Sequence, residues 1–392
     1  ARTARRTAPR TCFERQEEQV VRDQIRRALD SVIDPELRKP ITELGMVGDI
    51  SVTGDAVSID LKLTIVGCPA AQRIERDTIA AAMSVDGVKA VTVSLGVMST
   101  DERAELKAKL SGGRGPRVNP FDENTDTRIY LVGSGKGGVG KSSLTANLAV
   151  QLASDGFKVG LIDADIFGFS IPGQLGLTDK PTKIDDWILP PVYEVGANAV
   201  KVISIGMFVD EGKAVAWRGP MLHRAIQQFL TDVFWGDLDF LLVDLPPGTG
   251  DVAISLGQLL PTAKSIVVTT PQPAAADIAA RTAAVGLQTG QGILGVIENL
   301  SWFEQPDGTR AELFGTGGGK QVAERLSTES GATVELLGQV PFSNALREGS
   351  DGGSPIVLGN PNDPAAKAIA QIAARIQQDR LVRATRSLKL NL

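Results

Sequence analysis

The chain has 392 residues, of which 42% are hydrophobic, and 41 Lys and Arg stand against 46 Asp and Glu. A single hydrophobic core usually stops growing at roughly 250 to 300 residues, so we expect about two domains. The net charge of −5 gives no general reason to expect a nucleic-acid partner. Because there is no run of roughly 18 apolar residues and no apolar secretory signal, we expect a cytoplasmic protein without stable membrane association.

The N-terminal part is predicted to be a basic extension followed by a small domain. Residues 1–16 are expected to be disordered, since the first ten contain four arginines and no acid. Residues 17–98 are expected to form a compact α+β domain of order αββαβ. Periodicity of the apolar residues predicts a helix over 17–33, strands over 47–52 and 57–65, a helix over 69–83 and a strand over 88–93.

The chain contains only two cysteines, Cys12 and Cys68, too few for a disulfide framework or for a four-ligand metal site within one chain. Cys68 precedes Pro69 and the predicted helix, so we expect the helix dipole to favour its thiolate. The alternative is a buried core cysteine. Three segments, Asp34-Pro-Glu36, 44–47 and 63–69, resemble the small domain of metal–sulfur cluster assembly factors. This resemblance makes Cys68 a candidate iron–sulfur ligand.

Residues 99–127 are predicted to be a linker that contains a short charged helix and a Gly- and Pro-rich stretch. Directly after it, an apolar strand pattern over 129–132 leads into Gly135-x-x-x-x-Gly140-Lys141-Ser142, and leucines at helical spacing follow. This strand, loop and helix form the context of a phosphate-binding loop.

The residue types of the loop suit a nucleoside triphosphate. Glycines allow φ > 0 and a close approach of the backbone, and the helix N-terminus supplies positive potential. We expect Lys141 to pair with the β- and γ-phosphates and the Ser142 hydroxyl to ligate Mg²⁺. The residues predicted to bind the nucleotide here are Gly135, Lys136, Gly137, Gly138, Val139, Gly140, Lys141, Ser142 and Ser143.

A second interpretation of the same loop is a dinucleotide fingerprint. Gly133-x-Gly135-x-x-Gly138 has the required spacing, and Asp163 stands about where a ribose-binding acid would fall. A hydride-transfer enzyme has no use for Lys141-Ser142, so the phosphate loop is favoured.

Residues 128–378 are predicted to form an α/β domain with a doubly wound, mostly parallel sheet, followed by a basic tail over 379–392. Besides the first strand, the predicted strands are 158–162, 240–243, 265–270 and 293–297. The closing helix is expected to start at Pro364, with Asp363 as its N-cap, and to end near Gln377.

Acidic residues at the carboxyl ends of parallel strands enter the ligand crevice of such a sheet, which makes Asp163, Asp165 and Asp244 site candidates. Asp244 is expected to hold Mg²⁺ through water, and the Gly248 N–H to sense the γ-phosphate. A helix N-cap pair is the alternative for Asp163 and Asp165. His223 is expected to be structural, since nothing nearby supplies an acid–base partner.

The loop Gly135-Lys-Gly-Gly-Val-Gly-Lys-Ser142 resembles that of the dimeric ATPases with a deviant phosphate loop, and residues 217–251 resemble the Mrp/ApbC iron–sulfur cluster carriers. The resemblance covers about residues 20–375. It implies slow ATP hydrolysis with Mg²⁺, a homodimer, and iron–sulfur scaffold or recipient proteins as partners.

The resemblance also implies roles for single residues. Lys136 reaches the nucleotide of the opposite subunit, Asp165 positions or deprotonates the attacking water, and Asp163 helps the magnesium shell. The Asn299 amide reads the adenine base, for which a turn-forming Asn is the alternative. Pro341 and Phe342, which follow the last predicted strand, flank the adenine base.

The chain departs from the carriers at one place. After Phe303 they have Cys-Pro-x-Cys, whose thiolates from two subunits hold a [4Fe-4S] cluster, whereas this chain has Gln305-Pro-Asp-Gly308. We expect no cluster at that bridge, and any cluster would have to use Cys68. Two hypotheses remain: a nucleotide-gated iron–sulfur carrier, and a cluster-free dimerising switch that regulates or positions partner proteins.

Overall fold

The computed structural model describes residues 12–65, 67–111, 119–166, 168–208, 219–248, 251–288, 290–305 and 307–387. Most of the predicted basic extension, part of the linker, residues 217–218 and 249–250, Pro306 and the end of the basic tail lie outside these residues. The chain divides into two compact units, residues 1–116 with 182–185, and residues 117–181 with 186–392.

The first unit has the predicted order αββαβ. Its elements are α1 (Cys12–Ala28), the 3-10 turn η1 (Leu29–Ser31), β1 (Val47–Thr53), β2 (Ala56–Leu63), α2 (Ala71–Met83), β3 (Ala90–Val97) and α3 (Thr100–Ser111). The strand order is β1-β2-β3, with β1 antiparallel and β3 parallel to β2. Alternate residues of β2 are buried (Val57, Ile59, Leu61 and Leu63), as expected of a sheet with one covered face. Helix α1 starts five residues earlier than predicted.

The second unit is built on a nine-stranded sheet with the order β13-β12-β11-β4-β10-β5-β9-β8, in which β14 also pairs with β12. Its strands are β4 (Arg128–Ser134), β5 (Val159–Asp163), β8 (Val192–Val195), β9 (Asn198–Ser204), β10 (Phe240–Asp244), β11 (Lys264–Thr269), β12 (Gly292–Glu304), β13 (Arg310–Ala311) and β14 (Glu335–Phe342). Only β8 with β9 and β13 with β12 pair antiparallel among the described strands of this sheet. The predicted mostly parallel sheet is confirmed.

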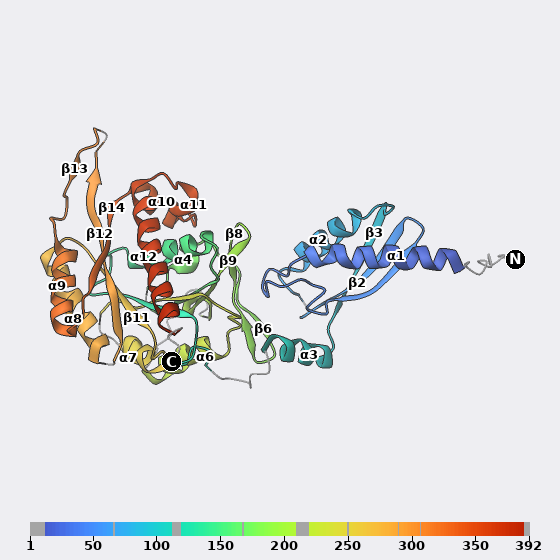
Figure 1. Cartoon of the computed structure of the whole chain (residues 1–392), viewed down its shortest axis with the longest axis horizontal. Coiled ribbons are helices and arrows are strands. Elements are labelled where there is room, and N and C mark those ends of the chain that lie inside the picture. Colours follow the sequence, from blue (N-terminus) through green and yellow to red (C-terminus); the bar gives the residue numbers. More distant parts are fainter. Residues whose placement is uncertain are drawn as a thin grey trace. The chain divides into compact units, whose positions relative to one another are not determined.

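Helices cover both faces of this sheet (Figure 1). Along β4, Tyr130 and Val132 belong to one core and Ile129 and Leu131 to another, because successive side chains of a strand point to opposite faces. The first core is closed by α4 (Lys141–Ser154), α5 (Ile171–Gln174), α10 (Asn344–Asp351), α11 (Ile356–Gly359) and α12 (Pro364–Ser387). The other face is covered by α6 (Gly219–Thr231), α7 (Asp251–Leu259), α8 (Pro273–Gln288) and α9 (Gly318–Ser330). The remaining elements of the second unit are β7 (Trp187–Leu189) and η2 (Ile205–Phe208), and β6 (Thr182–Ile184) belongs to the first unit.

Two elements run further than predicted. Strand β12 continues to Glu304 because β13 pairs with its end. Helix α12 continues to Ser387, beyond the predicted domain end. Near that predicted end, Asp379 ties the helix to the sheet: the Tyr130 hydroxyl donates to it at 2.9 Å and Lys264 Nζ lies 2.5 Å from it. At the other end of α12, Asp363 accepts from the Ala365 N–H, as the predicted N-cap should.

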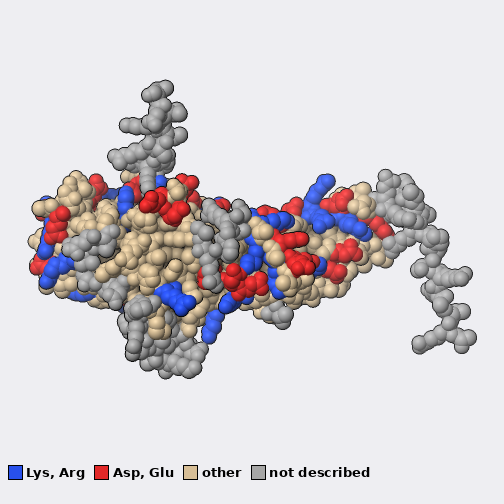
Figure 2. All heavy atoms as spheres, turned by 90° about the horizontal axis from the view of Figure 1, so that it is seen from below, with Lys and Arg blue, Asp and Glu red and all other residues tan. Residues whose placement is uncertain are grey.

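Basic and acidic side chains are interspersed on the face seen in Figure 2. Among the described helices, none is both long enough and apolar enough to cross a bilayer.

Candidate functional site

The phosphate loop connects β4 to α4, and its glycines serve different purposes. Gly138 and Gly140 have φ of +77° and +79°, which only glycine adopts readily. Gly135 allows a close approach, since a Cβ there would lie 2.5 Å from the Ala279 backbone nitrogen of α8. A Cβ on Gly137 would meet no described atom within 4 Å. Positive φ therefore accounts for two of the four predicted loop glycines.

A buried cluster lies where α4 begins, against the carboxyl end of β10. Lys141 Nζ lies 2.6 Å from Asp244 Oδ2, and the Ser142 hydroxyl donates to the same oxygen at 2.5 Å. The Thr145 hydroxyl lies 2.9 Å from Asp244 Oδ1. Lys141 and Asp244 are 6% and 1% exposed, so this is a buried ion pair. Sequence reasoning brought the first three residues together and missed Thr145, which lies one helical turn after Ser142.

The donors of this cluster are of the kind that Mg²⁺ and a polyphosphate require. Hydroxyl and carboxylate oxygens suit Mg²⁺, and a lysine ammonium suits phosphate oxygens. No group of three or more His, Cys, Asp or Glu that could hold a metal occurs among the residues that the structure describes. A magnesium ion here would rest on Ser142 and Asp244 together with the phosphates, which is how this ion is usually bound.

Asp163, at the end of β5, is fully buried and clamps the loop that follows it. Its Oδ2 accepts from the Ser204 hydroxyl at 3.0 Å and from the Ser170 and Ile171 N–H groups at the start of α5, and its Oδ1 accepts from the Asp165 N–H. Asp163 is not itself an N-cap residue, because the N-cap of α5 is Ser170. The magnesium role stays a prediction. Burial, and then the charge of Asp244, raise the pKa of Asp163 to about 7.

Asp165 lies on this loop, 8% exposed, and its Oδ1 accepts from the Gly168 N–H at 3.1 Å. Its predicted role toward water is untested by these contacts. The Gly248 N–H donates to the Ser134 carbonyl at 2.9 Å, and its predicted role toward the γ-phosphate stays a prediction. A γ-phosphate would have to displace this carbonyl before the N–H could sense it.

The Lys136 side chain contacts a residue of its own chain. Its Nζ donates to Gln272 Oε1 at 3.0 Å, and the Ser134 hydroxyl donates to its carbonyl. Gln272, between β11 and α8, was not predicted as a site residue. The reach of Lys136 to a second nucleotide stays a prediction.

Asn299 lies inside β12 and is 3% exposed, so the turn-forming alternative is wrong. Its Nδ2 donates to the Val139 carbonyl of the phosphate loop at 2.8 Å, while its buried Oδ1 has no hydrogen-bond partner among the described residues. A buried oxygen without a hydrogen-bond donor is unusual in proteins, and a donor on a bound ligand would satisfy it. Pro341 and Phe342 are the last residues of β14 rather than the residues after it, and Val340 pairs with Asn299 in register.

Cys68 corrects a prediction. It is 6% exposed, and burial first, with the charges of Glu36 and Asp34, raises the pKa of its thiol to about 11. The N–H groups of Ala70 and Ala71, at the start of α2, bond to the sulfur and lower its pKa, but burial and the two carboxylate charges outweigh them. The buried-cysteine alternative describes this thiol.

Gln305, Asp307 and Gly308, at the positions where the resemblance would place a cysteine pair, lie between β12 and β13. Asp307 Oδ1 accepts from the N–H and the hydroxyl of Thr309 at 2.9 and 2.6 Å, and the Gln305 N–H donates to the Thr309 carbonyl. Beside the turn, the Arg310 guanidinium stacks on Trp302, 4.1 Å from the ring centre. His223 lies half-buried on α6, and its predicted structural role stays a prediction.

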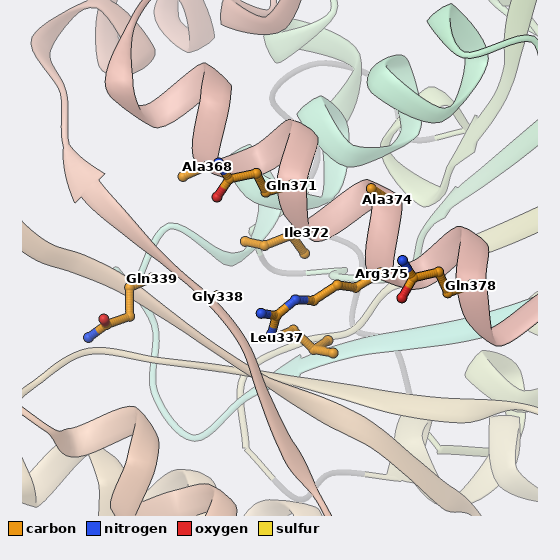
Figure 3. A pocket seen from close by; sticks show the side chains of 9 residues that line it. All are labelled: Leu337, Gly338, Gln339, Ala368, Gln371, Ile372, Ala374, Arg375 and Gln378. Carbon is orange, nitrogen blue, oxygen red and sulfur yellow. The ribbon is translucent and has the colours of Figure 1, made fainter.

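A cavity of about 340 Å³ lies elsewhere, between β14 and α12 (Figure 3). Its wall contains Leu337 and Gly338 from the strand and Ile372 and Arg375 from the helix, and no predicted site residue.

Comparison with known proteins identifies the family. The model of the NUBPL iron-transfer P-loop NTPases matches residues 126–377, and that of the iron–sulfur cluster assembly proteins matches residues 22–95. The chain belongs to the NUBPL iron-transfer P-loop NTPase family. Membership in a P-loop NTPase family rules out the dinucleotide fingerprint and confirms the predicted resemblance.

Relatives of this P-loop NTPase are similar over nearly their whole length. The iron–sulfur cluster carrier protein of Mycobacterium tuberculosis is 52% identical over 369 residues, which is 94% of this chain and 96% of the relative. That of Deinococcus radiodurans is 40% identical over 353 residues, covering 90% and 93%. A solved nucleotide-binding protein in complex with ADP from Archaeoglobus fulgidus is 36% identical, with 58% of this chain and 86% of that chain covered and a TM-score of 0.49.

Proposed function

We propose that this chain is an iron–sulfur cluster carrier that binds and hydrolyses ATP and works as a nucleotide-gated homodimer. The observation that carries the proposal is the buried cluster of Lys141, Ser142 and Asp244 at the carboxyl edge of a parallel sheet. Membership in an iron-transfer NTPase family and the names of its relatives support the cargo.

Each site residue has a role in this proposal. Lys141 neutralises phosphate charge. Ser142 would supply an oxygen ligand to Mg²⁺ and Asp244 would hold the ion through water, and Mg²⁺, when bound, offsets charge on the transferring phosphoryl group. Asp165 orients the attacking water. The buried Oδ1 of Asn299 accepts from an amine, such as that of adenine, because its Nδ2 is already engaged by Val139.

The proposed cargo is an iron–sulfur cluster, and the cysteines that would bind it differ from those that the resemblance implies. Residues 128–392 contain no cysteine, and Asp307 is engaged by the N–H and hydroxyl of Thr309. Cys68 is then the thiolate source, with two copies from a dimer and further ligands from a scaffold or recipient protein. Because the pKa of this thiol is about 11, ligation must also remove a proton at neutral pH, which weakens binding. We therefore expect labile, substoichiometric iron.

Anaerobic reconstitution tests the cargo. Iron and sulfide per chain are measured in the wild type and in Cys68→Ser, with ATP hydrolysis as the control for folding. We expect Cys68→Ser to lose whatever iron the wild type takes up while hydrolysis remains. A full, stable [4Fe-4S] cluster in Cys68→Ser contradicts the ligand assignment. A wild type without iron favours the second candidate, the cluster-free switch, which the missing cysteines already support.

A further inference from the structure

Thr145 is a fully buried residue of α4 whose hydroxyl points to the same carboxylate as Lys141 and Ser142. Its Oγ1 lies 2.8 Å from the Lys141 carbonyl, one helical turn before it, and 2.9 Å from Asp244 Oδ1. A hydroxyl has one proton to donate, and an ionised carboxylate is a stronger acceptor than an amide carbonyl. The geometry therefore favours a bond from Thr145 to Asp244.

The two oxygens of Asp244 have different surroundings. Oδ2 contacts Lys141 Nζ and the Ser142 hydroxyl, which are the two groups assigned to phosphate and magnesium. Oδ1 contacts Thr145, which is fixed in the first turns of a helix and is closed off from solvent. One side of the carboxylate thus faces the ligand groups, and the other side faces a fixed donor.

We propose that Thr145 is a positioning residue for magnesium, a role that rests on the proposed function of the site. Its hydroxyl anchors Oδ1 of Asp244 and keeps Oδ2 directed at Ser142 when Lys141 leaves the carboxylate for a phosphate. Without this anchor the carboxylate is free to rotate about its Cβ–Cγ bond. Groups that orient a metal ligand in this way typically change metal affinity by about 10- to 100-fold when removed.

The test separates magnesium affinity from nucleotide affinity. A fluorescent ADP analogue is titrated into the full chain with Mg²⁺ and with EDTA, and the ratio of the two affinities is compared among variants. Thr145→Val removes the hydroxyl at nearly constant volume, and Thr145→Ser keeps it. Thr328→Val in α9 is the matched control, since the Thr328 hydroxyl makes the same kind of helical bond, to the Glu324 carbonyl.

We expect Thr145→Val to lower the tightening by Mg²⁺ about tenfold or more, with the affinity in EDTA unchanged. Thr145→Ser and Thr328→Val should keep the wild-type ratio. A wild-type ratio in Thr145→Val, or an equal loss in Mg²⁺ and in EDTA, overturns the inference. Thr145→Ala answers the same question if the valine variant does not fold. If the wild type itself shows no tightening by Mg²⁺, the proposed function fails as well.

Discussion

At the scale of single residues, the ion pair of Lys141 and Asp244 belongs to the proposed nucleotide site, and it also affects the stability of the fold because both charges are buried. Both side chains are almost fully removed from solvent, and each satisfies the other. Removing one partner leaves an uncompensated buried charge, which typically costs about 3–5 kcal/mol.

This leads to a prediction for the nucleotide-free protein. Lys141→Met should lower the free energy of unfolding by about 3–5 kcal/mol, and Asp244→Asn in the same chain should recover part of the loss. Urea unfolding of the wild type, both single variants and the double variant measures this coupling. Additive effects of the two substitutions would mean that the pair is not coupled as the distances indicate.

Cys68 gives the second prediction at this scale. With a pKa of about 11, only a small fraction of the thiol, on the order of a thousandth, is ionised at pH 8. In a Cys12→Ser background, alkylation of the native protein by iodoacetamide should be slow at pH 8 and should accelerate up to pH 10. Glu36→Gln should shift this profile to lower pH, because it removes one of the carboxylates that raise the pKa. Rapid labelling at pH 7 in folded protein would refute the assignment.

At the scale of elements, the phosphate loop packs closely against the backbone of α8 at Gly135. An alanine at position 135 would bring its Cβ to 2.5 Å from backbone atoms of α8, and a real Cβ never approaches that closely. Overpacking of this kind costs about 1–3 kcal/mol. Gly135→Ala should therefore lower the midpoint of thermal unfolding measurably.

Gly137→Ala is the matched control for this prediction. Its Cβ would meet no described atom within 4 Å, and its φ is not positive, so the effect on stability should stay within about 0.5 kcal/mol. Equal destabilisation by the two substitutions would show that α8 does not confine the loop at Gly135.

The elements also show what sequence reasoning can and cannot reach. The parallel strands β4, β5, β10, β11 and most of β12, the phosphate loop, and the residues Lys141, Ser142 and Asp244 were predictable, because periodicity and motif spacing are local properties. Strands β6 to β9 and β13 were not predicted. Thr145 was also within reach, since it lies one turn after Ser142. Ser204 was not, because its contact with Asp163 depends on β9 lying beside β5, a pairing of segments 41 residues apart.

Two further errors have physical causes of the same kind. The helix dipole suggested a thiolate at Cys68, but the fold buries the sulfur and places Asp34 and Glu36 near it. The end of α12 was placed too early, and near that predicted end the helix is tied to the sheet by the bond from Tyr130 to Asp379, which joins residues 249 positions apart. Such long-range contacts override local preferences, and no pattern within one segment reveals them.

At the scale of the whole molecule, the proposal requires two chains. If Lys136 serves the nucleotide of a second subunit, it must first leave Gln272, to which it donates at 3.0 Å in the single chain. ATP should shift the protein toward a dimer, because a ligand stabilises the state that binds it better. Lys136→Ala should weaken that shift without preventing nucleotide binding. Light scattering coupled to size exclusion, with and without ATP, measures this, and an active protein that stays monomeric in ATP would contradict the dimer.

In the proposed function, the cluster at the start of α4 and the loop after β5 form an ATP hydrolysis site. The most direct test is phosphate release in Asp165→Ala, measured beside nucleotide binding in the same preparation. We expect Asp165→Ala to bind ATP as the wild type does and to lose hydrolysis. Lys141, Ser142 and Asp244 remain in place, while the residue assigned to the attacking water is gone. Hydrolysis at the wild-type rate in Asp165→Ala would contradict it.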